Sequence, residues 1–499
     1  MFYSSVMTQA LNGTGTGKSH QTAPPPPKPR TPASRDAHVM FKTADGAELQ
    51  GSLKHFTRQS ASFELYGEAV TLRLSEALAD FQINAAGQAI YAGQAVVSNL
   101  VNSSSKLVCE VDLEKTRWVP DPDLLSAIRS ESGVRQEFEK FECEWQKLYA
   151  VSPEFKVAVA DMQTFLNDLQ LWLNQVEIGF QASPAPERNK LERDFLGQIS
   201  ERAMRSLAAL FEKFEKLASS VEPQSRAAHS QYAQRILHPL VLCSPFMHRT
   251  FKKPLGYAGD YEMVRMMTLD PFQGSSLFAK LLNTFFLNTP PVVAHRNRID
   301  TLVRNLETET LRPPHKNPRF KIFNLGCGPA AEIQRFLEFS KRSSLVDFTL
   351  LDFNDETVAF AQRTMNHIKN QHGRGAGISV LKKSVTQLIK SSAQFKHGSY
   401  DLVYCAGLFD YLSDNVCTML LEIFYDLAAP GGLVLVSNVE ASNPSRGWME
   451  CMVDWHLVYR NARDMRGVIP KSVPMDCVRV YSEISSVNIF AEIRKPEDA

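Results

Sequence analysis

Apolar and polar residues alternate with a period of two between residues 38 and 113, a pattern that predicts short strands. Turn residues such as Asp45-Gly46 and Ala86-Gly87 separate the alternating runs. We expect strands at residues 39–42, 52–55, 62–66, 70–74, 79–83, 88–97 and 106–111. Short strands in this arrangement predict a small antiparallel barrel.

Residues 121–245 follow the longer period of an amphipathic helix. Their apolar stripe consists of Leu191, Phe195, Ile199, Leu207, Leu210, Phe214 and Leu217, opposite a charged face. The sequence ASPAP at residues 182–186 interrupts the pattern, so we expect at least two helices. A stripe of this kind is typical of packing surface, either inside a helical bundle or in a homodimer.

Beyond residue 320, short apolar runs alternate with helical segments. We expect strands at residues 320–325, 348–351, 378–381, 400–405, 433–436, 477–481 and 487–493. Strands that alternate with helices predict a doubly wound sheet with helices on both faces. The sequence therefore predicts a multidomain α/β protein, in which a small barrel and a helical region precede a Rossmann-like sheet of six or seven strands.

The first of these strands runs into the turn Gly326-Cys327-Gly328, after which Pro329 and Ala330 are expected to begin a helix. Glycines permit a positive φ and let a ligand approach bare backbone. The second strand ends in Asp352, at about the distance from the turn at which an acid binds ribose hydroxyls in doubly wound folds. A sheet that binds no ligand has no need for both features.

The turn and the acid together resemble class I S-adenosylmethionine-dependent methyltransferases. The resemblance implies S-adenosylmethionine as the cofactor, with its ribose on Asp352 and its amino group near Glu332. The donor site that it implies comprises Asn324, Gly326, Cys327, Gly328, Pro329, Glu332, Asp352, Phe353, Asn354, Ser384, Val385, Ala406, Gly407 and Leu408. A nicotinamide dinucleotide domain is disfavoured, because Ala331 stands where its fingerprint has a third glycine.

Ahead of the sheet, the sequence KPLGYAGDYE at residues 253–262 holds more glycine, tyrosine and acidic residues than a connection requires. In the methyltransferases that the chain resembles, helices ahead of the sheet cover the cofactor as a lid. The resemblance implies that Tyr257 contacts the cofactor and that Asp260 and Tyr261 lie beside the reacting groups. Tyrosine faces near a cationic sulfonium contribute roughly 0.5 to 2 kcal/mol. The alternative is a turn that packs for shape alone.

The acceptor is expected beyond the fifth strand, in an insertion that is rich in aromatic and charged residues. We predict a helix over residues 454–460, which places His456, Tyr459 and Arg460 on one face. His456 is the candidate base or orienting group, and Arg460 is the candidate cation for a carboxylate. Alternatively, Arg460 pairs with a structural acid and His456 packs in the core.

From about residue 230 to residue 499, the chain resembles bacterial methyltransferases associated with methyl esters of hydroxy fatty acids such as 3-hydroxypalmitic acid. This resemblance implies a small-molecule acceptor that is apolar with an acidic head. A carboxylate is already ionised at neutral pH, so its methylation needs no strong base. The alternatives are methylation of an oxygen or nitrogen of another small molecule or a protein, and a non-catalytic signalling scaffold.

The alternating N-terminal segment resembles the PilZ family of bacterial cyclic-dinucleotide-binding barrels. The family's R-x-x-x-R motif is absent, because Arg58 has no second arginine four residues on, and its D/N-x-S-x-x-G motif is absent too. We therefore expect a PilZ-like barrel that regulates the enzyme or binds a protein partner, without nucleotide binding.

Charge and composition narrow the classes of partner. The 55 basic and 54 acidic residues leave a net charge of +1, which gives no reason to expect nucleic acid or an anionic membrane surface. No apolar run reaches the ~18 residues of a membrane span and no signal pattern opens the chain, so we expect a cytoplasmic protein. The eight cysteines include no C-x-x-C pair, so we expect reduced thiols and no metal site.

We divide the chain into five parts. Residues 1–36, which are rich in proline, glycine and serine, are expected to form a disordered tail. Residues 37–115 are assigned to the barrel, 116–245 to the helical region, 246–315 to the lid segment and 316–499 to the methyltransferase domain.

Overall fold

The computed structural model of the protein describes residues 37–56, 60–66, 72–85, 88–103, 106–114, 151–180, 182–312 and 319–497, together with residues 134, 135, 138, 139 and 142. Several predicted features lie outside these residues. They are the tail at residues 1–36, Arg58, the Ala86-Gly87 turn, the first two residues of the strand predicted at 70–74, and most of residues 116–150 of the helical region.

Antiparallel strands close the predicted barrel, in the order β1-β2-β3-β6-β5-β4. They are β1 (His38–Lys42), β2 (Glu48–Phe56), β3 (Ser60–Tyr66), β4 (Ala77–Ala85), β5 (Gln88–Ser103) and β6 (Lys106–Leu113). Because side chains alternate along a strand, Phe41, Phe63, Phe81 and Tyr91 meet in a buried aromatic cluster inside the barrel. The prediction of a small barrel is confirmed.

The described part of the β3–β4 connection is residues 72–76, and residues 72–74 of the strand predicted at residues 70–74 are not strand. Leu72 is buried as its apolar character suggests, but the chain turns at Ser75, whose φ is 59°. The backbone here bonds in two directions. The amide of Ser75 donates to the carbonyl oxygen of Val97 in β5 at 2.8 Å, and the amide of Ala77 donates to the carbonyl oxygen of Gly256 at 2.6 Å. The connection therefore contacts the loop ahead of the sheet instead of adding a strand to the barrel.

A seven-stranded sheet forms the C-terminal part, in the order β12-β13-β11-β10-β7-β8-β9. Its strands are β7 (Phe320–Leu325), β8 (Val346–Asp352), β9 (Gly377–Lys382), β10 (Tyr400–Ala406), β11 (Ala428–Val439), β12 (Val478–Ser482) and β13 (Asn488–Arg494). β13 runs antiparallel to its neighbours, and the other pairs are parallel. The strand order reverses between β7 and β10, which is where doubly wound sheets bind ligands. The predicted sheet is confirmed.

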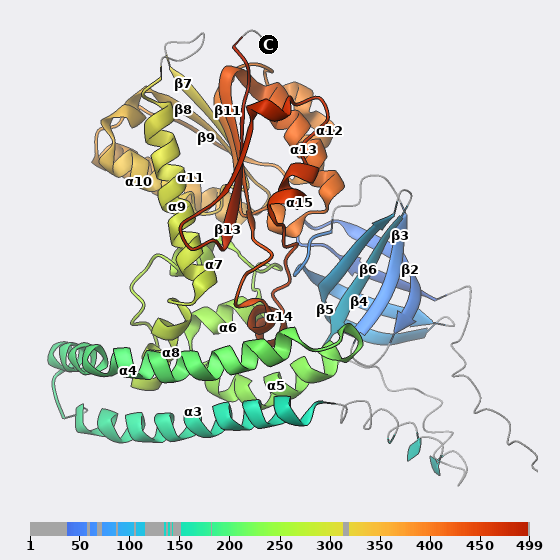
Figure 1. Cartoon of the computed structure of the whole chain (residues 1–499), viewed down its shortest axis with the longest axis vertical. Coiled ribbons are helices and arrows are strands. Elements are labelled where there is room, and N and C mark those ends of the chain that lie inside the picture. The colour runs from blue at the N-terminus through green and yellow to red at the C-terminus, as the bar shows by residue number, and fades with distance from the viewer. Residues whose placement is uncertain are drawn as a thin grey trace, which may run out of the picture. The chain divides into compact units, whose positions relative to one another are not determined.

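Helices cover both faces of this sheet (Figure 1). α9 (Pro290–Glu309), α10 (Ala331–Phe339) and α11 (Asp355–Gln371) pack on one face. α12 (Val385–Ser391), α13 (Asp414–Leu427) and α15 (Ala462–Gly467) pack on the other. Short 3-10 turns are η2 (Lys341–Leu345), η3 (Ser392–Gln394), η4 (Phe409–Tyr411) and η5 (Met475–Cys477). Burial on both faces explains why β10 reads as an almost continuous apolar run.

The helical region consists of α3 (Pro153–Phe180), α4 (Ala185–Ser219), η1 (Pro223–Ser225), α5 (Arg226–Val241), α6 (Pro245–Lys252), α7 (Tyr261–Met266) and α8 (Leu277–Phe286). The predicted break separates α3 from α4, because Pro184 has extended backbone and precedes the first helical residue of α4. Leu207 and Phe214 of the apolar stripe are fully buried. Among the described helices, none has both the length and the apolar character needed to cross a bilayer.

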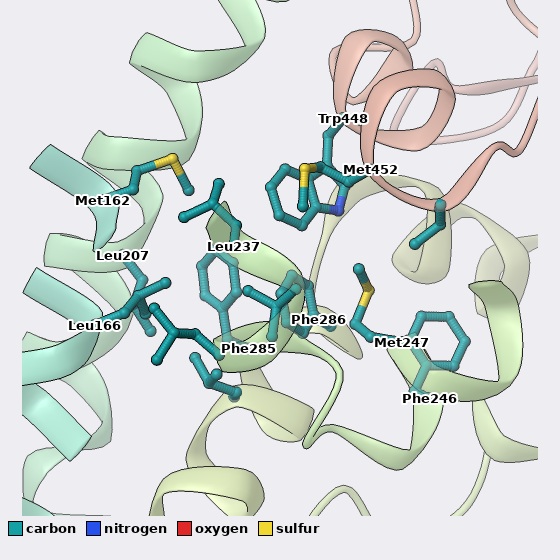
Figure 2. Packing of buried hydrophobic residues seen from close by; sticks show 14 of the residues in the cluster. Met162, Leu166, Leu207, Leu237, Phe246, Met247, Phe285, Phe286, Trp448 and Met452 are labelled. Atoms are coloured by element: carbon teal, nitrogen blue, oxygen red, sulfur yellow. The ribbon is translucent and has the colours of Figure 1, made fainter. Parts of the chain in front are cut away.

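The core of the helical region is completed by α14 (Arg446–Val453), which follows β11 in the chain. Figure 2 shows Trp448 and Met452 of α14 among residues of α3, α4, α5, α6 and α8. The rings of Trp448 and Phe286 stack, with centroids 5.6 Å apart. Glu215 of α4 accepts hydrogen bonds from the amides of Gly447 and Trp448, which fixes the start of α14. The buried part of the apolar stripe is thus covered within the same chain.

Two helix predictions are wrong. α10 begins at Ala331 and not at Pro329, because Ala330 has left-handed backbone with a φ of 53°. Residues 454–460 are not helical, because α14 ends at Val453 and Asp454 is left-handed with a φ of 48°.

The segment after Asp454 bonds instead to the ends of two other elements. The amide of Val458 donates to the carbonyl oxygen of Asp410 at 2.7 Å, and the amide of Arg460 donates to that of Val439 at 3.2 Å. Spacings of three and four residues place side chains on one face only in a helix. His456, Tyr459 and Arg460 therefore do not share the helical face that the sequence suggested.

Candidate functional site

The turn after β7 holds two glycines in left-handed backbone, with φ of 70° at Gly326 and 52° at Gly328. The amides of Gly326 and Cys327 both donate to the carbonyl oxygen of Leu351 in β8, at 2.8 and 3.1 Å. These bonds fix the turn against the neighbouring strand. A Cβ atom added to Gly328 would meet nothing within 4 Å, so this part of the turn presents open backbone.

Asp352 ends β8 beside this turn, and its carboxylate is buried. Its Oδ2 accepts a hydrogen bond from the amide of Gly328, and its Oδ1 accepts one from the amide of Asn354, both at 3.1 Å. Burial raises the pKa of Asp352, while the two amides act in the opposite direction. The carboxylate is held in one place by these bonds and retains lone pairs for hydroxyl donors.

The turn and Asp352 line a cavity of about 120 Å³, which we call the Gly326 cavity. Of the residues predicted from the sequence, it is lined by Asn324, Gly326, Cys327, Gly328, Pro329, Glu332, Asp352, Phe353, Val385, Ala406, Gly407, Leu408, Tyr257 and Tyr261. The structure therefore brings together the carboxyl ends of β7, β8 and β10 and the loop ahead of α7. Small-molecule pockets usually measure roughly 300 to 1,000 Å³, so a cofactor-sized ligand requires these walls to move apart.

Asn354, Ser384 and Asp260 do not line the Gly326 cavity. Each of them caps a helix, because its side chain accepts a hydrogen bond from a backbone amide in the first turn of α11, α12 or α7, respectively. Asp260 also forms an ion pair with Arg249, at 2.9 Å. These three side chains fix helices whose starts border the site.

Two polar residues that line the cavity from α9 were missed in the sequence. The Nδ1 atom of His295 accepts a hydrogen bond from Arg298 at 2.8 Å, while its Nε2 atom is buried without a hydrogen-bond partner among the described residues. Burial lowers the pKa of His295 well below its usual range, so the imidazole is neutral. A signal was available, because His295 interrupts the apolar face that Val292 and Ile299 define on α9.

The barrel also reaches the cavity, through Arg73 and Leu74 of the β3–β4 connection. No motif in the sequence marked these residues. Their contact with the sheet joins parts of the chain that are far apart in sequence, and hydrophobic periodicity does not record such contacts.

Arg460 lies outside the lining of the Gly326 cavity, and its side chain is only 1% exposed. Its guanidinium donates to the carbonyl oxygens of Phe409 and Leu412, at 2.8 and 2.7 Å. It also donates to Asn438 Oδ1 and Asp414 Oδ1, both at 2.7 Å. These bonds join the segment after β10 to the end of β11. They agree with the alternative interpretation, in which Arg460 pairs with structural groups.

His456 and Tyr459 also lie outside that lining. His456 lines a second cavity, of about 1370 Å³, which is bordered by barrel strands, α5 and α14. The ring of Tyr459 packs against Arg446, whose guanidinium carbon is 4.6 Å from the ring centroid. The structure therefore does not bring the predicted acceptor residues together with the predicted donor residues.

Titratable groups gather at one wall of the second cavity. Ligand-type atoms of Asp112, Asp454 and His456 lie within 4.8 Å of one another, with His456 Nε2 3.8 Å from Asp112 Oδ2. Burial, reinforced by the negative charge of Asp454, raises the pKa of Asp112 to about 8.

Replacing Asp112 by asparagine is expected to stabilise the protein near pH 8 and to change little near pH 4. The pKa of Asp112 is about 8 when folded against 3.8 as its ordinary value, so the folded state binds the proton more tightly. The stability that this proton contributes is complete below the lower pKa and is lost as the pH rises through the higher one. Urea unfolding at several pH values measures the difference, with the exposed barrel carboxylate variant Glu48→Gln as control. A difference that stays constant with pH would contradict the raised pKa.

Comparison with known proteins finds no matching family model. A curated relative, the uncharacterized protein RP028 of Rickettsia prowazekii, is 23% identical over 128 residues. The match covers 26% of this chain and 44% of the relative. The matched stretch therefore spans less than half of the relative's length.

Solved structures that match include a protein described as a possible exported protein from Bordetella parapertussis, with 17% identity and a TM-score of 0.39, covering 63% of this chain and all of that one. Magnesium protoporphyrin IX methyltransferase from Synechocystis, with bound SAH, has 12% identity and a TM-score of 0.30. The match covers 41% of this chain and 84% of that chain. The N-methyltransferase NodS from Bradyrhizobium japonicum, in complex with S-adenosyl-L-homocysteine, has 13% identity and a TM-score of 0.30. The match covers 50% of this chain and 100% of that chain. At these TM-scores the likenesses carry no argument about the function of this chain.

Proposed function

We propose that the protein is an S-adenosylmethionine-dependent methyltransferase and that the Gly326 cavity is its donor site. The observation that carries the proposal is the open backbone at Gly328 beside the buried carboxylate of Asp352, at the point where the strand order reverses. The arrangement fits a nucleoside, because ribose hydroxyls need acceptors and adenosine needs close contact with backbone. When bound, this cofactor supplies an electrophilic methyl group.

Different residues of the chain bind the ribose, the amino group and the adenine of the cofactor. Asp352 accepts hydrogen bonds from the ribose hydroxyls. Glu332 binds the amino group, since its Oε1 already accepts from the hydroxyl of Tyr404 at 2.7 Å and its other oxygen remains for the ligand. Phe353 borders the adenine, and the ring of Tyr257, 5.0 Å from that of Phe353, closes the cavity from the loop ahead of α7.

Positioning supplies most of the rate in this proposal. Methyl transfer is an in-line displacement, and holding the two reactants in line contributes roughly 7 to 11 kcal/mol. The loop ahead of α7 and the β3–β4 connection border the cavity, so closure of these walls over the reactants excludes water.

For the acceptor we propose the carboxylate of a hydroxy fatty acid or a similar apolar acid, on the resemblance over residues 230–499. Arg460 is committed to structural groups, so it does not serve the acidic head. Arg298 is better placed than Arg460, because it lines the Gly326 cavity, where it also pairs with Asp410 at 3.9 Å. A carboxylate needs no strong base, which agrees with a cavity whose histidine, His295, is held by Arg298.

The acceptor is tested with purified protein, methyl-labelled donor and 3-hydroxy acids of medium and long chain. Labelled methyl ester supports the proposal. Transfer to hydroxyl or amine compounds without ester supports an oxygen or nitrogen methyltransferase of another class. Tight donor binding without transfer to any acceptor supports a signalling scaffold.

Replacing Gly328 by alanine is expected to lower donor affinity at least tenfold while the protein still folds. The new methyl group meets no atom of the chain, but it occupies the space that the donor needs. Its effect on folding is limited to the left-handed backbone, about 1 to 2 kcal/mol. Calorimetric titration of S-adenosylhomocysteine measures the loss.

Gly373→Ala is the matched control for this substitution. Gly373 also has a positive φ, of 61°, and a Cβ atom added to it would also meet nothing within 4 Å, but it follows α11 away from the cavity lining. The control should share the cost in stability and keep the donor affinity. Equal affinities in the two variants would exclude contact between the donor and Gly328.

A further inference from the structure

Arg73 of the β3–β4 connection is a buried arginine whose positive charge acts on the carboxylates of Asp352 and Glu76. The residue is 9% exposed and lines the Gly326 cavity. Its guanidinium carbon lies 4.0 Å from the ring centroid of Phe353, the residue after Asp352. Within the part of the chain that the structure describes, its guanidinium forms no hydrogen bond or ion pair. None of its nitrogen atoms is fully buried without a hydrogen-bond partner, so these donors remain accessible from the cavity and are available to a ligand.

The backbone of Arg73 is held firmly from the barrel side. Its amide donates to Glu76 Oε2 at 2.9 Å, and the other oxygen of Glu76 accepts from the amide of Ala44 at 2.8 Å. Glu76 is 3% exposed, and its backbone forms an isolated antiparallel β-bridge with Tyr257 in the loop ahead of α7. The connection and that loop therefore form one wall of the Gly326 cavity.

The same connection is held from the opposite side by Ser75. Its hydroxyl donates to the carbonyl oxygen of His456 at 3.0 Å and accepts a hydrogen bond from the amide of the same residue. Ser75 is fully buried and has a left-handed φ of 59°. Strained backbone persists where surrounding contacts fix it, so the place of the neighbouring Arg73 is set by the structure.

We propose that Arg73 is a donor-binding residue that the barrel contributes to the methyltransferase site, and that its guanidinium donates hydrogen bonds to acceptor atoms of the donor's adenosine. This inference rests on the proposed function. The stacking on Phe353, next to the ribose-binding Asp352, places the guanidinium on the adenosine side of the cavity. Its planar set of donors suits ring nitrogens and ribose oxygens. The barrel is then part of the active site, whatever else it binds.

The test measures the affinities of wild type and Arg73→Met for three ligands by calorimetry. They are S-adenosylmethionine, S-adenosylhomocysteine and 5′-methylthioadenosine, the last of which keeps the adenosine and lacks the amino acid. We expect all three to bind about 10- to 100-fold more weakly to the variant, because each loses hydrogen bonds to a charged group. Lys42→Met is the control, since it removes a barrel cation that pairs with Glu48 and Asp80 at the surface.

A second measurement separates ligand binding from a structural role. Without ligand, Arg73→Met should melt close to the wild-type temperature, because the lost attraction to Asp352 and Glu76 is offset by removal of a largely buried charge that forms no hydrogen bond among the described residues. A lowered melting temperature with unchanged affinities would show that Arg73 only supports the fold.

The other outcomes are also decisive. Unchanged or tighter donor binding in Arg73→Met would overturn the inference while leaving the methyltransferase proposal intact. Weaker binding of the first two ligands with normal binding of 5′-methylthioadenosine would place Arg73 on the amino acid and overturn the adenosine assignment. If the wild-type protein binds none of the three ligands, the proposed function itself is contradicted.

Discussion

Replacing Asp352 by alanine is expected to abolish measurable binding of S-adenosylmethionine and S-adenosylhomocysteine. The carboxylate offers acceptors to two ribose hydroxyls, and a hydrogen bond to a charged group contributes roughly 1.5 to 3 kcal/mol. Losing both reduces affinity by a factor of about one hundred or more. The variant also frees the amides of Gly328 and Asn354, which loosens the turn that the donor contacts. Calorimetric titration of both ligands into wild type and variant measures the effect.

Asp355→Asn is the matched control for this experiment. Asp355 lies three positions on, at the start of α11, where its side chain is 78% exposed and pairs with Lys382. Its substitution removes one acid from the same surroundings and should leave donor affinity unchanged. Equal losses in the two variants would point to a general effect of charge. If wild type binds the two ligands and Asp352→Ala binds them equally well, Asp352 does not bind the ribose. The donor site would then lose its main support.

Replacing Arg460 by methionine is expected to destabilise the protein by about 3 to 5 kcal/mol. The substitution removes the arginine donor from the carbonyl oxygen of Leu412 and the side-chain oxygen of Asn438, while the carbonyl oxygen of Phe409 keeps only the amide of Leu412. Each buried group that loses its partner costs roughly 1 to 3 kcal/mol. Urea unfolding followed by tryptophan fluorescence measures the change.

Arg463→Met provides the control, because Arg463 is exposed in the nearby helix α15 and its loss should change stability by less than about 0.5 kcal/mol. The folded Arg460→Met protein should bind S-adenosylmethionine with nearly the affinity of wild type. A variant of unchanged stability that had lost turnover of acidic acceptors alone would restore the catalytic role suggested by the sequence.

Local pattern was sufficient for the strands of the sheet and for its glycine turn. β7 runs over the predicted residues, because a strand buried on both faces is apolar throughout and ends at an obligatory turn. The barrel strands were found from their alternation, because each of them buries one face only. The segment after Asp454 was misjudged, because its aromatic and charged residues fit a helical face, while its backbone is held by Asp410 and Val439. Such tertiary bonds override local preference.

The donor residues supplied by the strand ends could be predicted because they follow the strands in sequence. Tyr257 and Tyr261, ahead of the sheet, were also predicted, whereas the residues from α9 and from the barrel were missed. His295 and Arg298 come from a helix that precedes the sheet, and Arg73 comes from the barrel. The sequence around these residues does not indicate which distant surface they contact, so their position at the cavity became apparent only in the structure.

The position of α14 has a consequence for how the chain is made. The helices from residue 153 to residue 286 are synthesised well before Trp448, which fills the centre of their core. Until α14 leaves the ribosome, Phe286 and its neighbours lack their stacking partner, and the nascent helices keep apolar surface open to water. The helical region can therefore complete its core only after most of the sheet has been translated. A chain shortened before residue 446 should accumulate as aggregate or remain bound to chaperones.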